Sequence, residues 1–367
     1  CITMKLLVLL VTLFYLTLLS SSPVTAQGCR NSPDNSLGVC TIVQQCPELN
    51  SIYQQVRRGG SGIDILRRSL CGNKTPLKVC CPQATRSSTS LPNDCGINFR
   101  NDRIINGHDA GLGTHPWMVV FRGSSRTQKF WFCGGVLITD RHILTAAHCF
   151  TTGIKIEFVR IGEYDISTNP DRDIENNIVA PQHQDINVAE VIKHEQFGAG
   201  RCRKCNDIAI VKLASPARFD KQFVQPICLP VNPQRDMGFR ASQFQNTELD
   251  GVATGWGITD PRDIIASATR GSNKLQEVYL RMKERSFCQQ QKRNNPGLKI
   301  LCAGEGDGRD TCRADSGGPL MLTNNHGQKW FAVGITSFSD TVCGSADSQT
   351  IFTDVYQYID WIKQKLV

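Results

Sequence analysis

The chain has 367 residues, of which 40% are hydrophobic, and 41 Lys and Arg against 33 Asp and Glu give a formal net charge of +8. So small an excess predicts a mildly basic, solvated surface and argues against a nucleic-acid-binding protein, although acidic partner segments stay an alternative. No apolar run reaches the roughly 20 residues of a membrane span. The 17 cysteines are the most unusual feature of the composition.

The N-terminus reads as a secretory signal over residues 4–26. Met4 and Lys5 open an apolar run from Leu6 to Leu19, and small residues up to Ala26 suit a cleavage site. The mature chain is then expected to begin near Gln27, to be soluble and to be extracellular. Cys1 precedes Met4, and its removal leaves 16 cysteines, an even number in an oxidising compartment.

Residues 27–81 contain six cysteines, and the last two are adjacent. A stretch this short and polar needs covalent links to fold, so we expect three disulfides. A zinc knuckle is the alternative, but its CxxC or CxH spacings are missing here. The spacing resembles the clip domain of arthropod proteases. An N-glycosylation sequon begins at Asn73 within this module.

Residues 82–103 form a linker that is Ser/Thr/Pro-rich from Pro82 to Asp94 and ends in a candidate activation site. From Ile104 onward, short β-rich runs alternate with turns, as at Trp117–Phe121 and Ile208–Leu213, which predicts an all-β domain over 104–367. Val355, Ile359, Ile362 and Leu366 follow helical spacing and predict a closing helix.

Three motifs occur in the order His, Asp, Ser: TAAHC at His148, NDIA at Asp207 and DSGGP at Ser316. Serine is a weak nucleophile that needs a base, and the base needs a carboxylate to orient it. This order of motifs resembles the chymotrypsin/trypsin family. The resemblance makes His148 the general base, Asp207 its orienting group and Ser316 the nucleophile, and a buried structural histidine is the lesser alternative for His148.

The resemblance also implies two six-stranded β-barrels and storage as a zymogen. Cleavage after Arg103 would free the ammonium of Ile104, which would bury against Asp315 and order the oxyanion loop. Arg103 as a simple linker residue is the alternative.

Family resemblance further implies a set of disulfides: Cys29–Cys80, Cys40–Cys71, Cys46–Cys81, Cys95–Cys228, Cys133–Cys149, Cys288–Cys302 and Cys312–Cys343. The Cys95–Cys228 bridge would tether the two chains after activation. Cys202 and Cys205 remain, and a local bridge between them competes with a reactive thiolate beside Arg and Lys.

The substrate pocket departs from the family pattern. Asp310 matches the carboxylate that selects Arg or Lys, but Ser339 and Thr350 replace two glycines of the pocket walls, as in elastases with shallow pockets. Ala314 replaces the glycine whose N–H forms the oxyanion hole with that of Ser316, and loss of one such donor costs ~10²–10³ in rate.

No cofactor is expected to be required, but calcium is an alternative for the loop that starts at Glu163 and Asp165. Trypsins bind calcium there through oxygen ligands. However, the loop is longer in this chain, and Gln184 falls where a second glutamate is expected.

The resemblance thus implies a secreted zymogen endopeptidase of an extracellular cascade in immunity, melanisation, Toll-ligand processing or clotting. Expected partners are an upstream activating protease, a zymogen or pro-cytokine substrate and a serpin-type inhibitor. The alternatives are a weak or non-catalytic adaptor homologue and a venom protease, while the clip-like module argues against digestion.

Overall fold

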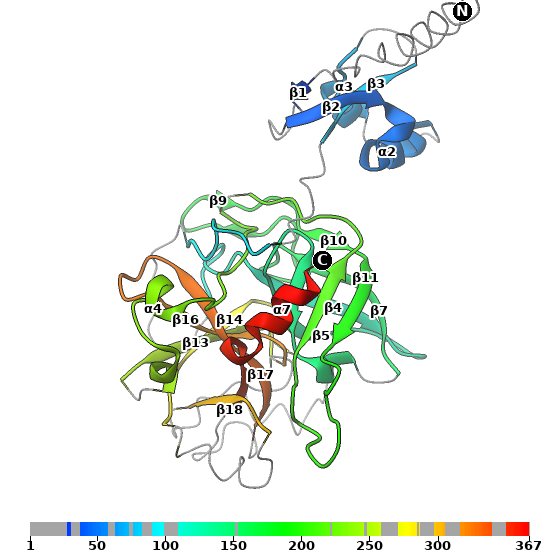
Figure 1. The fold of residues 1–367 in the computed structure, drawn as a ribbon. Coiled ribbons are helices and arrows are strands. Elements are labelled where there is room, and N and C mark those ends of the chain that lie inside the picture. Colours follow the sequence, from blue (N-terminus) through cyan, green and yellow to red (C-terminus); the bar gives the residue numbers. More distant parts are fainter. Residues whose placement is uncertain are drawn as a thin grey trace, which may run out of the picture. The chain divides into compact units, whose positions relative to one another are not determined.

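The computed structural model describes residues 28–30, 37–57, 63–72, 76–82, 90–98, 109–150, 153–220, 222–245, 248–257, 271–284, 286, 297–304, 316–339 and 350–366. The chain divides between Arg86 and Ser87 into two compact units, both of which appear in Figure 1. Within the described residues, no helix is long and apolar enough to cross a membrane.

The smaller unit is a three-stranded antiparallel sheet with two helices. Its elements are β1 (Gly28–Arg30), β2 (Leu37–Ile42), the 3₁₀ turn η1 (Val43–Gln45), α2 (Pro47–Arg57), α3 (Ile63–Arg68) and β3 (Lys78–Pro82). The buried apolar cluster is small: Val43, Cys46, Leu49, Leu66 and Val79. Three disulfides supplement it, Cys29–Cys80, Cys40–Cys71 and Cys46–Cys81. Such linking is expected where a core is too small to hold the fold alone.

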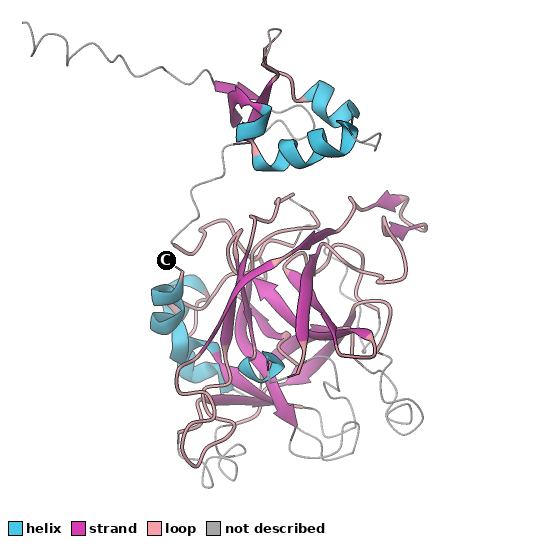
Figure 2. Cartoon of the chain, turned by 90° about the vertical axis from the view of Figure 1, so that its right-hand side faces the viewer, coloured by secondary structure: helices cyan, strands magenta, loops and turns pink. Residues whose placement is uncertain are grey.

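The larger unit is built mainly of strands, as Figure 2 shows. Its first sheet has the order β10-β7-β4-β5-β6-β12-β11. The strands are β4 (Met118–Ser124), β5 (Lys129–Leu137), β6 (His142–Thr145), β7 (Lys155–Ile161), β10 (Gln184–Ile186), β11 (Val188–Lys193) and β12 (Ala209–Leu213). Only Asn187 separates β10, which pairs with β7, from β11, which pairs with β12. Counted as one bent strand, they close the sheet into a six-stranded barrel.

The second sheet has six strands in the order β14-β13-β16-β17-β18-β15. They are β13 (Asp250–Gly255), β14 (Gln276–Arg281), β15 (Ile300–Ala303), β16 (Pro319–Thr323), β17 (Trp330–Ser339) and β18 (Thr350–Asp354). Lys283 N donates to Cys302 O at 2.9 Å and Gly304 N to Arg281 O at 3.0 Å, so the two edge strands meet. The double-barrel, all-β fold expected from the sequence is confirmed.

Short elements complete this unit: η2 (Ala147–Phe150), the hairpin β8 (Arg172–Asp173) and β9 (Ile178–Val179), α4 (Pro233–Asp236), η3 (Ala241–Gln245), η4 (Val355–Tyr358) and α7 (Ile359–Lys365). The expected closing helix is confirmed in η4 and α7. Val355, Ile362 and Leu366 are at most 1% exposed, and they share one apolar cluster with Ile208 and Ile210. The C-terminal helix is therefore fixed by the same core that supports the strand after Asp207.

Candidate active site

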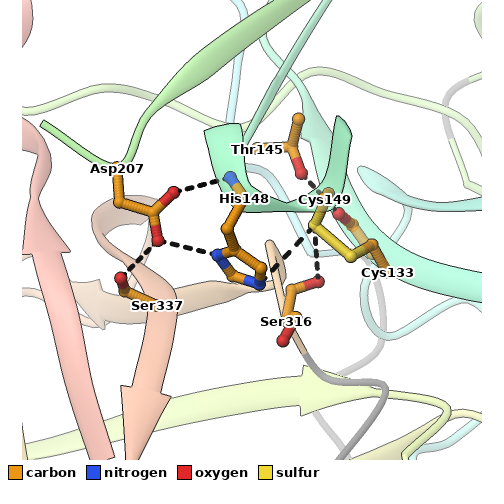
Figure 3. Close-up of a disulfide and its surroundings, with 8 residues drawn as sticks. Cys133, Thr145, His148, Cys149, Asp207, Ser316 and Ser337 are labelled. Carbon is orange, nitrogen blue, oxygen red and sulfur yellow. Dashed lines mark hydrogen bonds and ion pairs between the residues drawn. A yellow bond between two sulfur atoms is a disulfide. The ribbon is translucent and has the colours of Figure 1, made fainter. Parts of the chain in front are cut away.

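His148 and Asp207 form a hydrogen-bonded pair. His148 lies in η2, which one residue separates from the end of β6, and one residue separates Asp207 from β12, which pairs with β6. His148 Nδ1 is 2.7 Å from Asp207 Oδ2, and the backbone N–H of His148 donates to Asp207 Oδ1 at 2.9 Å (Figure 3). The Asp207 side chain is 4% exposed and that of His148 is 30% exposed. Thus the acid is enclosed while the imidazole reaches solvent.

Ser316 is attached to the first barrel through its backbone. Gly134 N donates to Ser316 O at 2.9 Å, and Gly134 O accepts the hydroxyl of Thr145 at 2.8 Å. Gly317 has a φ of +80°, and a Cβ there would lie 2.3 Å from Thr145 Oγ1 and 2.6 Å from Gly134 O. Glycine at 317 is therefore required for this close approach between the two barrels.

The Cys133–Cys149 disulfide lies beside the pair, and Figure 3 shows it with its sulfur atoms close to the imidazole. Cys149 Sγ is 3.9 Å from His148 Nε2 and 3.8 Å from Ser316 O. Cys133, His148 and Cys149 would otherwise resemble a metal-binding trio. Because both sulfurs are consumed in the disulfide, they offer no thiolate ligand.

Two hydroxyl groups that carry no sequence motif support Asp207. Ser337 on β17 donates to Asp207 Oδ2, and Thr353 on β18 donates to the backbone carbonyl of Asp207 at 2.8 Å. Asn206, immediately before the acid, has a φ of +57° and receives the hydroxyl of Tyr358 at 3.0 Å. A carboxylate held from several sides is a fixed partner for the imidazole.

Two further disulfides join described cysteines. Cys95–Cys228 links distant segments of the chain, and Cys202–Cys205 is a local bridge. For the second pair, the bridge replaces the alternative of a reactive thiolate. Cys302 is disulfide-bonded as well, but the partner expected for it, Cys288, lies outside the described residues. Cys312 and Cys343 also lie outside them.

Several other expected site residues fall outside the described residues: Asn73, Arg103, Ile104, Asp310, Ala314 and Asp315. Of the expected pocket walls, Ser339 and Thr350 are register partners at the ends of β17 and β18. Thr350 is 0% exposed. The roles of these residues in the pocket stay predictions.

The loop considered for calcium brings Glu163 close to Asp171, which the sequence interpretation did not select. Burial and the neighbouring charge of Asp171 raise the pKa of Glu163 to about 8, against the opposing effect of Arg160. Tyr164 N donates to both carboxyl groups, at 2.9 and 2.8 Å. Asp165 instead accepts the hydroxyl of Ser167, at 2.5 Å.

Gln184, which falls where a second calcium-binding glutamate was expected, is also bonded to another part of the chain. Its side-chain amide donates to the carbonyl of Arg218 and accepts from the N–H of Arg218, both at 2.8 Å. Glu163 and Asp171 are both buried, and Glu163 pairs with the Arg160 guanidinium at 3.2 Å. Two carboxyl groups placed together nevertheless make a cluster of the hard oxygen type that suits calcium.

Comparison with known proteins identifies the family. The family described as Trypsin matches residues 104–362. The chain belongs to the trypsin family of serine proteases. The regulatory CLIP domain of proteinases matches residues 29–81, so this trypsin-family protease carries a clip domain in the smaller unit.

Several relatives are similar along most of this chain and most of their own length. CLIP domain-containing serine protease B4 of Anopheles gambiae is 31% identical, over 93% of this chain and 92% of the relative. Phenoloxidase-activating factor 3 of Holotrichia diomphalia is 30% identical, over 94% and 95%. Spaetzle-processing enzyme of Drosophila melanogaster is 30% identical, over 94% and 93%.

Among solved structures, the crystal structure of the Drosophila Grass clip serine protease of the Toll pathway matches with a TM-score of 0.61 and 28% identity. That match covers 92% of this chain and 96% of the Grass chain. The family resemblance read from the cysteines and the three motifs is confirmed.

Proposed function

We propose that this clip-domain protease is a secreted zymogen endopeptidase of an extracellular cascade, activated by cleavage after Arg103. The single observation that carries catalysis is the buried Asp207 bonded to a solvent-reaching His148, with Ser316 fixed beside them. Secretion is supported by the apolar N-terminal run and by disulfides in both units. The names of two relatives, phenoloxidase-activating factor 3 and Spaetzle-processing enzyme, favour an immune cascade.

The proposed reaction is acyl transfer to serine and then to water. His148 Nε2 takes the proton of the Ser316 hydroxyl as its oxygen attacks the scissile carbonyl, and Asp207 stabilises the imidazolium that forms. The same proton then passes to the leaving amine as the peptide C–N bond breaks. Water, activated by His148, hydrolyses the acyl-enzyme and restores the serine. The N–H groups of Ser316 and Ala314 would bind the oxyanion.

Activation would use the motif at Arg103. The new N-terminus at Ile104 would form an ion pair with Asp315 and so order the oxyanion loop. The substrate would be another zymogen or a pro-cytokine, the activator an upstream protease, and the inhibitor a serpin. The clip domain would dock partners or regulate activation.

Labelling by a serine-directed phosphonate tests this proposal. The purified protein should take no label as a single chain, label once cut after Arg103, and lose labelling in Ser316→Ala. Arg103→Gln should remain an inert single chain. If the cleaved wild-type protein takes no label, the alternative of a non-catalytic adaptor prevails.

We also propose calcium as a stabilising ligand of the loop after Glu163. Glu163 and Asp171 would hold the ion through their carboxylate oxygens. The support is the chemistry of the site, since the charge of Asp171 disfavours ionised Glu163 and a cation would relieve that repulsion.

A further inference from the structure

The Cys202–Cys205 disulfide lies directly before the catalytic acid, and only Asn206 separates it from Asp207. Its two cysteines are 3 positions apart, whereas the other two bridges between described cysteines of the larger unit have sequence separations of 16 and 133. A bridge that closes so short a loop removes little conformational entropy from the unfolded chain. The fold therefore depends on this bridge less than on the longer ones.

The two cysteines of this bridge differ in their access to solvent. Cys205 is 4% exposed within an apolar cluster, while Cys202 is partly exposed at the surface. The four cysteines of the other two bridges are at most 9% exposed. A thiol reagent can therefore reach Cys202 more easily than any of those four, and exposed disulfides are the ones that are reduced most readily.

The residues around Cys202 are positively charged. Arg201, Arg203 and Lys204 are all exposed, within four consecutive positions. Glu195, the acid earlier in the same segment, is paired with Lys365. Positive charge stabilises the thiolate that forms when a disulfide is reduced, so it favours the reduced form of this bridge.

The loop that ends at Cys205 has few other constraints on its backbone. Gly198 and Gly200 both have a φ of +66°, and glycine loses more conformational freedom on folding than any other residue. The backbone bonds from Gly198 N to Cys205 O and from Cys205 N to Cys202 O are long, at 3.3 Å each. Without the bridge, the freedom of the glycines and the repulsion among the cations would loosen residues 198–205.

Asn206 connects this loop to the acid. Its φ of +57° is uncommon for a residue other than glycine, and such a conformation persists only while the surrounding contacts hold it. Its side-chain amide donates to the Gln196 carbonyl at 3.1 Å and accepts the Tyr358 hydroxyl at 3.0 Å. Because Gln196 lies just before the same loop, loosening the loop would weaken the first of these bonds and allow the backbone before Asp207 to turn.

We propose that Cys202–Cys205 is a site of reversible reduction by dithiols, and that reduction lowers the activity of this protease. The bridged form holds Asp207 in its catalytic orientation, and the reduced form does not. This inference rests on the proposed endopeptidase function. The competing explanation is that the bridge only stabilises the loop, in which case its reduction leaves catalysis unchanged.

The reduction is a thiol–disulfide exchange. One thiolate of the dithiol attacks Cys202 Sγ, the S–S bond of the protein breaks, and Cys205 leaves as a thiolate. The second thiol of the reagent then displaces Cys202, and the reagent departs as a disulfide. Two electrons pass from the reagent to the protein, and the two protons that the dithiol loses are balanced by the two that Cys202 and Cys205 take up as thiols.

The first measurement asks which bridge opens. The full-length protein, cut after Arg103, is equilibrated in buffers with increasing ratios of reduced to oxidised dithiothreitol. Free thiols are then alkylated and located by mass spectrometry. Cys202 and Cys205 should be alkylated at a ratio at least about tenfold below the ratio that opens Cys95–Cys228 or Cys133–Cys149.

The second measurement follows catalysis over the same ratios, with a substrate that consists of a P1 residue alone. Such a substrate has no residues N-terminal to P1 that could contact the loop. Opening the bridge should lower kcat about threefold or more with little change in KM, because a displaced group costs rate and not binding. The acid limb of the pH–kcat profile should move to lower pH, because a displaced Asp207 stabilises the imidazolium of His148 less. Both changes should reverse when oxidised dithiothreitol restores the bridge.

Variants assign the effect to this bridge. The double variant Cys202→Ser, Cys205→Ser should match the reduced wild type in kcat and pH profile and should not respond to dithiothreitol. The double variant Arg201→Gln, Arg203→Gln keeps the bridge, so its kcat in the bridged form should equal that of the wild type. It should need a more reducing buffer for opening, because less positive charge stabilises the thiolate.

The outcomes separate this inference from the proposed function. A Cys202–Cys205 bridge that opens only in buffers that also open the buried bridges overturns the inference, and so does selective opening that leaves kcat and the pH profile unchanged. In both cases the endopeptidase stands, because the bridged enzyme still takes the phosphonate label. A cleaved and bridged protein that takes no label rejects the proposed function, and the control of activity with it.

Discussion

Ser337 and His148 bind the same oxygen atom of Asp207. The serine hydroxyl donates to Oδ2 from β17, and the imidazole Nδ1 lies 2.7 Å from that oxygen. Since β17 belongs to the second barrel and His148 to the first, the carboxylate joins the two halves of the site. Its orientation therefore depends on a residue that no catalytic motif contains.

We predict that Ser337→Ala lowers kcat with little change in KM. A hydrogen bond to a charged group contributes about 1.5–3 kcal/mol, so its loss should reduce kcat by at least about tenfold. Steady-state kinetics on a peptide substrate measure both constants. Ser337→Thr keeps the hydroxyl and is the matched control. An unchanged kcat in Ser337→Ala would show that His148 and the backbone suffice to orient Asp207.

The sequence predicted the parts of this site that are encoded locally. The motifs around His148 and Asp207 named the pair, and alternating apolar runs predicted the strands that bring it together. Ser337 and Thr353 were missed because a hydroxyl donor on a distant strand has no local signature. Its role depends on sheet register, which is set by pairing along the whole barrel.

The acidic loop after Glu163 is a second case in which the sequence alone did not predict the contacts. Glu163 was selected, but its buried companion is Asp171, not Asp165. Which carboxyl group turns inward depends on the path of a loop longer than that of trypsins, and composition does not encode that path. For Cys202 and Cys205, the sequence allowed either a disulfide or a reactive thiolate. The distance between the two sulfur atoms in the structure was needed to choose the disulfide.

We predict that His142 makes a contribution to stability that is lost as pH is lowered from about 6.5 to about 4, while Glu163, whose pKa is raised to about 8, acts in the opposite direction. The His142 side chain is 0% exposed, and burial followed by Lys212 and Arg141 lowers its pKa to about 4. In that window the unfolded chain binds a proton at His142 that the folded chain excludes, so the contribution of His142 to the free energy of unfolding decreases, by at most about 1.4 kcal/mol per pH unit.

Urea unfolding with intact disulfides, repeated between pH 4 and 7.5, measures this dependence. His142→Asn should make the unfolding free energy fall less, or rise more, on acidification than that of the wild type, whereas the exposed His326→Asn should keep the wild-type slope. If His142→Asn keeps the full wild-type slope, other groups cause the acid sensitivity.

We predict that the activated protein stays joined through one disulfide. Cys95 and Cys228 are 7% and 3% exposed, and Gly96 next to Cys95 donates to the Pro226 carbonyl at 2.9 Å. After cleavage following Arg103, the two chains should separate on a denaturing gel only with reductant.

The double variant Cys95→Ser, Cys228→Ser should separate without reductant. The double variant Cys202→Ser, Cys205→Ser removes a bridge internal to the heavy chain and should behave as wild type. Separation of the wild type without reductant would contradict the tether.

We predict that calcium raises the melting temperature and that Glu163 is required. Calcium at 100 times its Kd would stabilise the folded state by ~2.7 kcal/mol. For a domain of this size, we therefore expect the melting temperature to rise by a few degrees. Thermal unfolding with calcium and with a chelator measures the shift. Glu163→Gln should abolish it. Asp185→Asn is the control, because Asp185 pairs with Arg160 on the exposed side of the cluster. A wild-type melting temperature that is the same with calcium and with the chelator would refute the site.

We predict that the pocket walls weaken cleavage after Arg or Lys. Ser339 and Thr350 are register partners at the ends of β17 and β18, and the family resemblance predicts glycines at both positions. A long P1 side chain directed at Asp310 would meet the side chains of Ser339 and Thr350. The double variant Ser339→Gly, Thr350→Gly should therefore raise kcat/KM for P1-Arg peptides. Relief of ~2 kcal/mol corresponds to roughly 30-fold.

Ala314→Gly is the matched comparison, because it acts on the oxyanion and not on the pocket. It should raise kcat for every peptide whatever its P1 residue, since the oxyanion forms in each reaction. Profiling the activated enzyme over all P1 residues, with both sets of variants, separates the two effects. Glycine in a strand costs stability, so activity is compared per phosphonate-labelled site. Vigorous wild-type cleavage after Arg that the double glycine variant does not improve would show that this pocket accommodates both side chains.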